Sequence, residues 1–198
     1  MIKFDASNHL EITEDHWLDP VRRIVSPNQD ERPVGYDISL LVIHAISLPP
    51  GEFGTGEVAR LFTNSLDCSA HPSYSSLDGV RVSSHVLIDR KGKSTQFVPF
   101  DRRAWHAGES SFDGQKECNN FGIGIELEGT ERVPFTEHQY SVLIAIARVL
   151  MERYPCIQPH RIVGHNEIAP NRKWDPGPQF DWPMFNDRLF KLGVRQKT

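Results

Sequence analysis

The sequence predicts a single-domain α/β fold in which a central mixed β-sheet is flanked by helices. Residues 39–46 and 121–129 are apolar runs of strand length, and residues 81–98 contain two further runs. Residues 136–154 instead repeat apolar side chains at helical spacing. Strands interleaved with helices in one chain of 198 residues are typical of a sheet protein of this class.

The first 80 residues contain one clear strand. Residues 1–38 look irregular because three prolines interrupt them. The run SLLVIHAI at 39–46 combines branched and apolar residues, which predicts a buried strand. Prolines and glycines end this strand, and a short helix is expected at 57–66, followed by a loop at 67–80.

The middle of the chain predicts three more strands. Residues 81–98 are expected to form two of them, joined by a turn at 90–93 in which Gly92 can adopt a positive φ. The run FGIGIELEG at 121–129 predicts the third strand.

The last third of the chain predicts two helices. The helix at 136–154 begins with the capping-box pair Thr136 and Gln139. A final helix is expected at 181–192. The segment GHNEIAPNRKWDPGPQFDW at 164–182 is too rich in proline to predict a helix or a central strand.

Composition excludes several classes of partner. The net charge of -4 argues against nucleic-acid and membrane-surface binding, both of which favour a basic face. The sequence has no apolar run that could span a bilayer, and its acidic start does not resemble a signal peptide. Three cysteines without a CxxC pair favour a reducing compartment over a disulfide framework, so a cytoplasmic protein is expected.

Two histidines and one carboxylate form a candidate metal site. His44 lies inside an apolar strand, and His165 and Asp175 lie in the proline-rich segment. Each has an ordinary alternative, because a core histidine can bond a carbonyl and an aspartate can cap a turn. Together they are the ligand set of a catalytic zinc site, which predicts one Zn²⁺. Such a site suits amide hydrolysis, and Lys173 could stabilise the oxyanion unless it is an ordinary surface lysine.

The strand at 121–129 offers a candidate general base. Period-two alternation places Phe121 with the isoleucines on one face and Glu126 and Glu128 beside glycines on the other. A partly desolvated carboxylate there would have a raised pKa, as a general base requires. Glu126 is preferred because it lies deeper in the strand, and the alternative is a pair of solvated acids on an exposed face.

The segment RRAWHAGES at 102–110 adds Trp105 and His106 before a small Ala-Gly step. An aromatic ring beside small residues in a loop can form a platform for a sugar ring. The equally good alternative is that Trp105 fills part of the core.

Five segments of the chain, in order, resemble the zinc-dependent N-acetylmuramoyl-L-alanine amidases. They are LLVIHAISLPPGEFG, HPSYSSLDGVRVSSHVLIDRKG, VPFDRRAWHAG, CNNFGIGIELEGT and GHNEIAPNRKWDPGPQFDW. They are most similar to the AmpD-type branch, the bacterial cytoplasmic enzymes that act on 1,6-anhydro-muropeptides. The resemblance runs from about residue 17 to about residue 185. It implies a peptidoglycan-recognition-type amidase fold for one domain that spans 1–198.

The resemblance also implies roles for residues that match the family motifs. His44, His165 and Asp175 match the zinc ligands. Glu126 matches the catalytic carboxylate, and Lys173 matches the lysine that assists catalysis.

Two further positions match residues that contact substrate in the family. Arg81 matches a basic residue directed toward the peptide stem, and Trp105 lies in the loop that borders the saccharide. His85 and His106 also match family motifs, but neither is assigned as a ligand.

The implied reaction cuts the amide between the lactyl group of anhydro-N-acetylmuramic acid and the L-Ala that begins the stem peptide. The resemblance therefore implies peptidoglycan recycling by a cytoplasmic enzyme, which we expect to be a monomer with no nucleic-acid or membrane partner. In organisms with such enzymes, uncleaved anhydro-muropeptides can signal for β-lactamase induction.

Three positions depart from the family pattern. Ala45 stands where relatives usually carry Asn after the first zinc histidine, which predicts weaker support for that ligand. Glu117 stands where relatives tend to have Arg, which predicts weaker recognition of a diaminopimelate carboxylate. Trp174 replaces a smaller residue and is expected to reshape the rim of the pocket.

Two other functions share the expected fold. A peptidoglycan-binding module that has lost hydrolysis typically lacks a zinc ligand, whereas this chain keeps the full set with Glu126 and Lys173. A secreted or phage-type lytic amidase would act on intact cell wall. The resemblance to the cytoplasmic branch argues against it.

Overall fold

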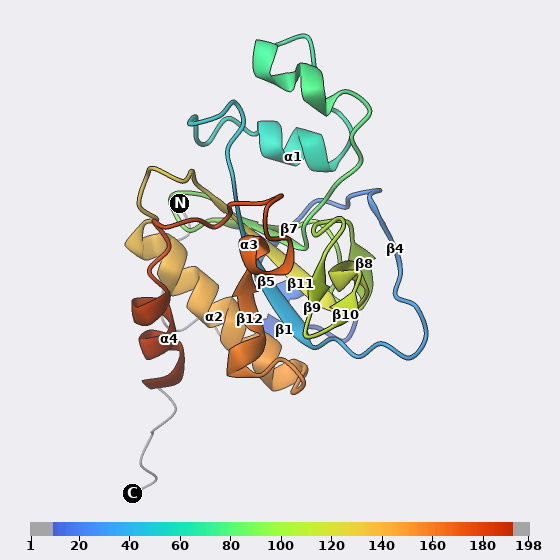
Figure 1. Cartoon of the computed structure of the whole chain (residues 1–198), viewed down its shortest axis with the longest axis vertical. Helices are drawn as coiled ribbons and strands as arrows, with labels where there is room; N and C mark the ends of the chain where they lie inside the picture. Colours follow the sequence, from blue (N-terminus) through green and yellow to red (C-terminus); the bar gives the residue numbers. More distant parts are fainter. Residues whose placement is uncertain (1–9, 192–198) are drawn as a thin grey trace, which may run out of the picture.

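A six-stranded mixed sheet lies at the centre of the computed structural model, which describes residues 10–191 (Figure 1). The strand order is β12-β5-β11-β6-β7-β3. The strands are β3 (Arg22–Arg23), β5 (Leu40–Ile46), β6 (Val86–Ile88), β7 (Ser94–Gln96), β11 (Gly122–Glu128) and β12 (Ile162–Gly164). Neighbours pair in parallel except β6 and β7, which are antiparallel, so the predicted central mixed sheet is confirmed.

Three small antiparallel pairs surround this sheet. They join β1 (Glu11–Ile12) to β2 (Leu18–Asp19), β4 (Gln29–Glu31) to β8 (Arg102–Ala104), and β9 (Ser111–Phe112) to β10 (Gln115–Lys116). The prediction of an irregular segment at 1–38 is therefore wrong at the short strands β1 to β4 and agrees with the rest of residues 10–38. The first nine residues lie outside the described part. Strands of two or three residues are too short to show a period in the sequence.

The two predicted C-terminal helices are confirmed. They are α2 (Glu137–Arg153) and α4 (Trp182–Lys191), which pack against each other beside the sheet (Figure 1). Residue 192 of the expected final helix lies outside the described residues. The structure adds the short α3 (His165–Ile168) and three 3₁₀ helices: η1 (Pro72–Leu77), η2 (Cys118–Asn120) and η3 (Pro159–Arg161). The expected loop at 67–80 therefore contains one of these helical turns.

The helix expected at 57–66 is shorter than predicted. It is α1 (Glu57–Phe62), and it ends four residues early. Asn64 adopts a left-handed conformation with φ 58°, and the amide of Ser65 donates to the carbonyl of Arg60 at 2.8 Å. A left-handed residue that closes the last turn in this way terminates a helix.

The hairpin predicted within 81–98 is confirmed for residues 86–96. β6 and β7 pair around a turn in which Gly92 has φ 78°. Residues 81–85 precede the paired ladder and do not form a strand of their own.

The two faces of the sheet bury different clusters. The face under α2 carries Ile43, Ile123, Ile125 and Leu127 among its fully buried residues. A smaller cluster, which includes Leu40, Val42, Ala107, Cys118, Phe121, Val163 and Ile168, contains the alternate positions of β5. The alternation predicted for β11 is confirmed from Ile123 onward. It is wrong for Phe121, because that residue ends η2 with ψ 0° and lies outside the extended strand.

The capping box at α2 carries a testable prediction. The hydroxyl of Thr136 accepts from the amide of Gln139 at 3.2 Å, and the Gln139 side chain accepts from the amide of Thr136 at 3.0 Å. Thr136→Ala is expected to lower the free energy of unfolding by about 1 kcal/mol, because the first turn loses a partner. Urea titration should show a lower midpoint at unchanged slope. Thr136→Ser keeps the hydroxyl and should unfold near the wild-type midpoint; an equal loss in both variants would contradict this explanation.

Two expectations from composition can be compared with the described residues. Cys68, Cys118 and Cys156 are free thiols, as expected of a chain without a disulfide framework. Cys118 is buried and Cys156 is exposed, so the cysteines do not all fill the core. Between residues 10 and 191, no helix has the length and apolar character needed to cross a membrane.

Candidate metal centre

Strand register brings the candidate site residues together at the carboxyl ends of the parallel strands. His44 on β5 lies directly opposite Glu126 on β11. Gly164, the last residue of β12, lies opposite Ile43, so His165 begins α3 beside His44. The carboxyl ends of parallel strands are where α/β sheets usually place ligands.

Asp175 completes a compact cluster with the two histidines. Nδ1 of His44 lies 2.9 Å from Nδ1 of His165 and 3.2 Å from Oδ2 of Asp175. Nδ1 of His165 lies 3.0 Å from the same oxygen. All three residues are buried. The amide of Asn166 donates to the carbonyl of Asp175 at 2.9 Å and so ties this loop to α3. The structure therefore assembles three donor atoms suitable for one metal ion.

The hydrogen-bonding capacity of these atoms fits a cation. Nε2 of His165 lies 3.0 Å from the carbonyl oxygen of Ala107, which can only accept, so Nε2 carries the proton of a neutral ring. Nδ1 of His165 then presents a lone pair to the carboxylate of Asp175, which also only accepts. Ligand atoms around a tetrahedral zinc ion, at about 2.0–2.1 Å from it, stand about 3.3 Å apart. The observed separations of 2.9–3.2 Å are close to that value.

Burial sets the charge state of the cluster. It lowers the pKa of His44 to about 4, and His165 adds to this shift, so His44 is neutral at pH 7. A neutral imidazole and an ionised carboxylate are the protonation states that metal binding requires.

Glu126 and Glu128 have different surroundings although both face the same side of β11. Oε2 of Glu126 is buried and has no hydrogen-bond partner among the described residues. Burial raises the pKa of Glu126 well above its ordinary value, Asp175 raises it further, and Lys173 opposes the shift. Glu128 accepts hydrogen bonds from the amides of Gly54 at 2.8 Å and Arg90 at 3.3 Å. Glu126 is thus the chemically free carboxyl group.

Glu126 lies inside β11 and Glu128 is its last residue, so the expected positions of the two acids along the strand are confirmed. Glu128 is nevertheless the more buried residue overall, whereas Glu126 is half-buried. The alternative of two solvated acids on an exposed face is wrong. The reason is that Glu128 is covered by the loops after β5 and β6, whose amides donate hydrogen bonds to its carboxylate.

Lys173 lies at the edge of the cluster. Its side chain is exposed, while its charge acts on both Glu126 and His44. Its amide donates to the carbonyl of Ala169 at 3.1 Å, which fixes the turn between α3 and Asp175. The structure therefore brings Lys173 to the same site as the three metal-ligand candidates and Glu126.

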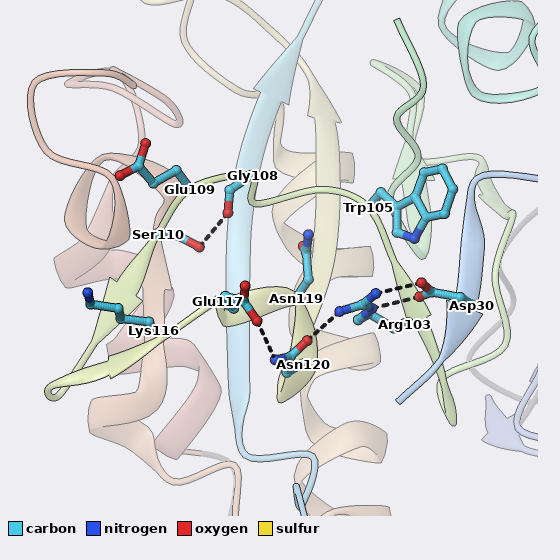
Figure 2. A pocket seen from close by; sticks show the side chains of 10 residues that line it. All are labelled: Asp30, Arg103, Trp105, Gly108, Glu109, Ser110, Lys116, Glu117, Asn119 and Asn120. Atoms are coloured by element: carbon cyan, nitrogen blue, oxygen red, sulfur yellow. Dashed lines mark hydrogen bonds and ion pairs between the residues drawn. The ribbon is translucent and has the colours of Figure 1, made fainter. Parts of the chain in front are cut away.

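A separate cavity of about 530 Å³ borders this site (Figure 2). Figure 2 shows a chain of polar contacts along it, from Asp30 through Arg103 and Asn120 to Glu117. The metal-ligand candidates do not line this cavity. Trp105 and Gly108 do, and they flank the His106–Ala107 segment that contacts both histidines from outside. The cavity is therefore adjacent to the metal centre but distinct from it.

The two predicted substrate-contacting residues differ in their placement. Trp105 is half-buried and lines the cavity, so it does not simply fill the core. Arg81 is exposed in the segment before β6 and is not among the residues that line the cavity. The structure brings Trp105 near the site and leaves Arg81 apart from the cavity.

Residues 34–178 match the family model described as N-acetylmuramoyl-L-alanine amidase. The chain belongs to this family. The amidase is 51% identical over 187 residues to the 1,6-anhydro-N-acetylmuramyl-L-alanine amidase AmpD of Citrobacter freundii, which covers 94% of this chain and 100% of that protein. The resemblance inferred from the sequence segments is thus confirmed.

Solved structures give the same fold. A crystal structure of a selenomethionine derivative of AmpD matches with a TM-score of 0.86 at 50% identity, covering 89% of this chain and 97% of that one. The amidase AmiD of Escherichia coli, solved in complex with anhydro-N-acetylmuramic acid-L-Ala-D-gamma-Glu-L-Lys, matches with a TM-score of 0.57 at 29% identity. That match covers 91% of this amidase and 65% of AmiD.

Two departures from the family pattern acquire a physical meaning in this amidase. Ala45 belongs to the apolar cluster under α2, because alternation turns it away from the face that carries His44. The side chain of Ala45 therefore faces away from the metal-ligand candidates, and the predicted weaker support for His44 stays a prediction. Glu117 has a left-handed backbone with φ 60° and accepts from the Nδ2 of Asn120 at 3.0 Å, so it is held at the cavity wall.

The third departure lies beside a metal-ligand candidate. Trp174 is 44% exposed, and its ring lies against Gly177, where an added Cβ would approach Cε3 to 3.1 Å. The indole thus packs against the turn that follows Asp175.

The proline-rich segment was only partly understood from its sequence. Its first residue, Gly164, ends the edge strand β12, so the expectation that the segment forms no central strand agrees with the structure. The expectation that it forms no helix was wrong, because α3 follows at once. Four helical residues fit before Pro170 because a helix usually ends at or before the residue that precedes a proline. His106 is the residue whose place at the metal centre was missed. Its signal was the small Ala-Gly step after it, which lets the segment approach the ligands closely.

Proposed function

We propose that this amidase hydrolyses the bond between the lactyl group of anhydro-N-acetylmuramic acid and the L-Ala of a muropeptide, with Zn²⁺ held by His44, His165 and Asp175. The observation that carries the proposal is the set of three mutually adjacent donor atoms with the free carboxyl group of Glu126 on the neighbouring strand. The names of AmpD and AmiD support the choice of substrate.

Two imidazole nitrogens and one carboxylate oxygen favour zinc among common metals, and three protein ligands leave a coordination position for reaction. Zn²⁺ in such a site polarises a carbonyl and makes water acidic near neutral pH. The remaining roles belong to the side chains that surround the ligands.

Glu126 is the proposed proton acceptor. Its buried Oε2 has no partner in the described residues, so it is free to bond a water molecule that attacks the scissile carbonyl. Its raised pKa makes it a stronger base than a solvated carboxylate. The proton taken from water then passes to the departing nitrogen of L-Ala, which leaves as an amine.

Lys173 is the proposed stabiliser of the negative charge that develops on the carbonyl oxygen. Its ammonium group acts on Glu126 and His44 from the exposed edge of the site, where it can approach that oxygen. We further propose that Arg81 contacts the peptide stem and that Trp105 borders the saccharide. Support for Trp105 comes from its place in the cavity wall next to the metal centre (Figure 2).

We also propose a cytoplasmic enzyme of peptidoglycan recycling that acts as a monomer, without nucleic-acid or membrane partners. Its single amidase domain would span 1–198 with a core at about 17–185, a range that contains the family match at 34–178. The similarity to AmpD supports this assignment over that of a lytic enzyme.

The proposal is tested by incubating the purified protein with anhydro-muramyl-tripeptide and identifying the products by mass spectrometry. We expect release of free tripeptide, loss of cleavage after a chelator removes the metal, and recovery on addition of Zn²⁺. Intact sacculi serve as the comparison substrate and should be cleaved far more slowly. Absence of cleavage by the zinc-loaded protein would instead favour a peptidoglycan-binding module.

A further inference from the structure

One short segment contacts both candidate ligand histidines on the side away from the metal position. Nδ1 of His106 lies 3.0 Å from Nε2 of His44. The carbonyl oxygen of Ala107 lies 3.0 Å from Nε2 of His165. Two consecutive residues thus contact the outer nitrogens of the two candidate ligands. His106 contacts His44 through its side chain, and Ala107 contacts His165 through its backbone carbonyl.

The proton positions of these contacts follow from the capacity of each atom. The Ala107 carbonyl only accepts, so it fixes the proton of His165 on Nε2 and leaves Nδ1 free to bind a metal. For His44 to present Nδ1 in the same way, its Nε2 must donate to Nδ1 of His106. His106 then carries its own proton on Nε2, an atom that is buried and without a partner among residues 10–191.

The position of His106 is tightly defined. Its ring lies over Gly124 of β11, where an added Cβ would come within 2.5 Å of the ring Cγ. Such a separation is impossible for ordinary contacts, so the ring occupies space that only a glycine leaves open. The ring also meets His44 edge to face, with centroids 5.1 Å apart.

The backbone of the segment is held from both sides. Oδ1 of Asn119 accepts from the amides of His106 at 3.1 Å and Ala107 at 2.8 Å. Nη2 of Arg172 donates to the carbonyl of Ala107 at 2.6 Å, from the loop that leads to Asp175. These contacts leave the segment little freedom to move relative to the two histidines.

We infer that His106 is a positioning residue of the metal centre, which accepts the Nε2 proton of His44 and thereby directs Nδ1 toward the metal. The inference rests on the metal site of the proposed function. Outer partners of this kind fix the ring orientation and raise the basicity of the ligand, and their loss typically lowers metal affinity 10- to 100-fold. In this protein a neutral imidazole is the hydrogen-bond acceptor for the ligand N–H, a role that a carboxylate or a backbone carbonyl usually has.

A pair of variants separates hydrogen bonding from packing. His106→Leu keeps an apolar body of similar size and removes the acceptor, whereas His106→Asn places an amide oxygen near the position of Nδ1. The zinc dissociation constant of each purified protein is measured by competition with a chromophoric chelator, after a thermal melt has shown that the metal-free protein is folded. His160→Gln, at an exposed position in η3, is the matched control.

We expect His106→Leu to bind Zn²⁺ roughly 10- to 100-fold more weakly than wild type, while His106→Asn recovers most of the loss. His160→Gln should bind as wild type does. Wild-type affinity in His106→Leu would overturn the inference, and so would equal losses in the Leu and Asn variants, because either result assigns His106 a packing role.

A measurement on the wild-type protein tests the inference even if the variants do not fold. Two-bond proton–nitrogen NMR correlations of the zinc-loaded protein report which ring nitrogen of each histidine carries hydrogen. We expect Nε2–H for His44 and an unprotonated Nδ1 for His106; a protonated Nδ1 on His106 would overturn the inference. Since both experiments measure binding and protonation, a protein that binds Zn²⁺ normally but cleaves no muropeptide would count against the proposed function alone.

Discussion

Asp175→Ala is expected to abolish both metal retention and amide hydrolysis. Oδ2 of Asp175 lies within 3.2 Å of Nδ1 of both His44 and His165, so no other atom of the cluster can replace it. Removal of a direct ligand should lower zinc affinity by more than the roughly 10- to 100-fold that is typical for an outer partner. Two imidazoles alone form an incomplete site for this ion.

The measurement is the metal content after dialysis, read by inductively coupled plasma mass spectrometry, together with hydrolysis of anhydro-muramyl-tripeptide. Asp187→Ala is the control, because Asp187 is an exposed acid of α4 that pairs with Lys191. It should retain metal and activity. Undiminished zinc in Asp175→Ala would show that the ligand assignment is wrong.

Glu126→Gln is expected to keep the metal and lose turnover by about 10²- to 10⁴-fold, the range typical for removal of a general base. The amide has nearly the shape of the carboxyl group but cannot take a proton from water. Glu128→Gln is a matched variant on the same face of β11. Glu128 accepts hydrogen bonds from the amides of Gly54 and Arg90. We therefore expect Glu128→Gln to lower the unfolding temperature and to keep turnover close to that of the wild type.

The raised pKa of Glu126 adds a pH dependence to this comparison. Burial makes the folded, metal-free protein bind the carboxyl proton more tightly than the unfolded chain does. Above the ordinary pKa of 4.5 the unfolded chain releases this proton while the folded protein still holds it, so the free energy of unfolding falls with rising pH until the pH passes the raised pKa. Metal-free Glu126→Gln should melt above wild type at pH 8 and match it below pH 4.5. In the separate activity assay, wild-type turnover by Glu126→Gln would show that another residue is the general base.

Much of the sheet and part of the site could be predicted from local sequence. The strands that became β5 and β11 have clear apolar runs, and their alternation places His44 and Glu126 on faces that can meet. The burial of Glu128 could not be predicted, because it depends on amides from two distant loops.

Other features depend on contacts between distant segments. Strands β1 to β4 have two or three residues each, too few for a periodic pattern. The role of His106 became visible only when the fold placed its ring between Gly124 and His44. Sequence spacing carries no information on which ring nitrogen faces which partner, so the proton arrangement had to come from the structure.

The order of the three metal-ligand candidates along the chain bears on how the enzyme is made. His44 and Asp175 are separated by 131 residues, and His165 is 121 residues beyond His44. A ribosome therefore releases the first of these side chains long before the last, and a chain truncated before Asp175 lacks one of the three candidates. A metal ion that binds only the folded protein raises its free energy of unfolding by RT ln(1 + [L]/Kd), where [L] is the free metal concentration and Kd is its dissociation constant. If the proposed centre holds a metal, supply of the ion would set the lifetime of the finished enzyme against unfolding and proteolysis as well as its rate of catalysis.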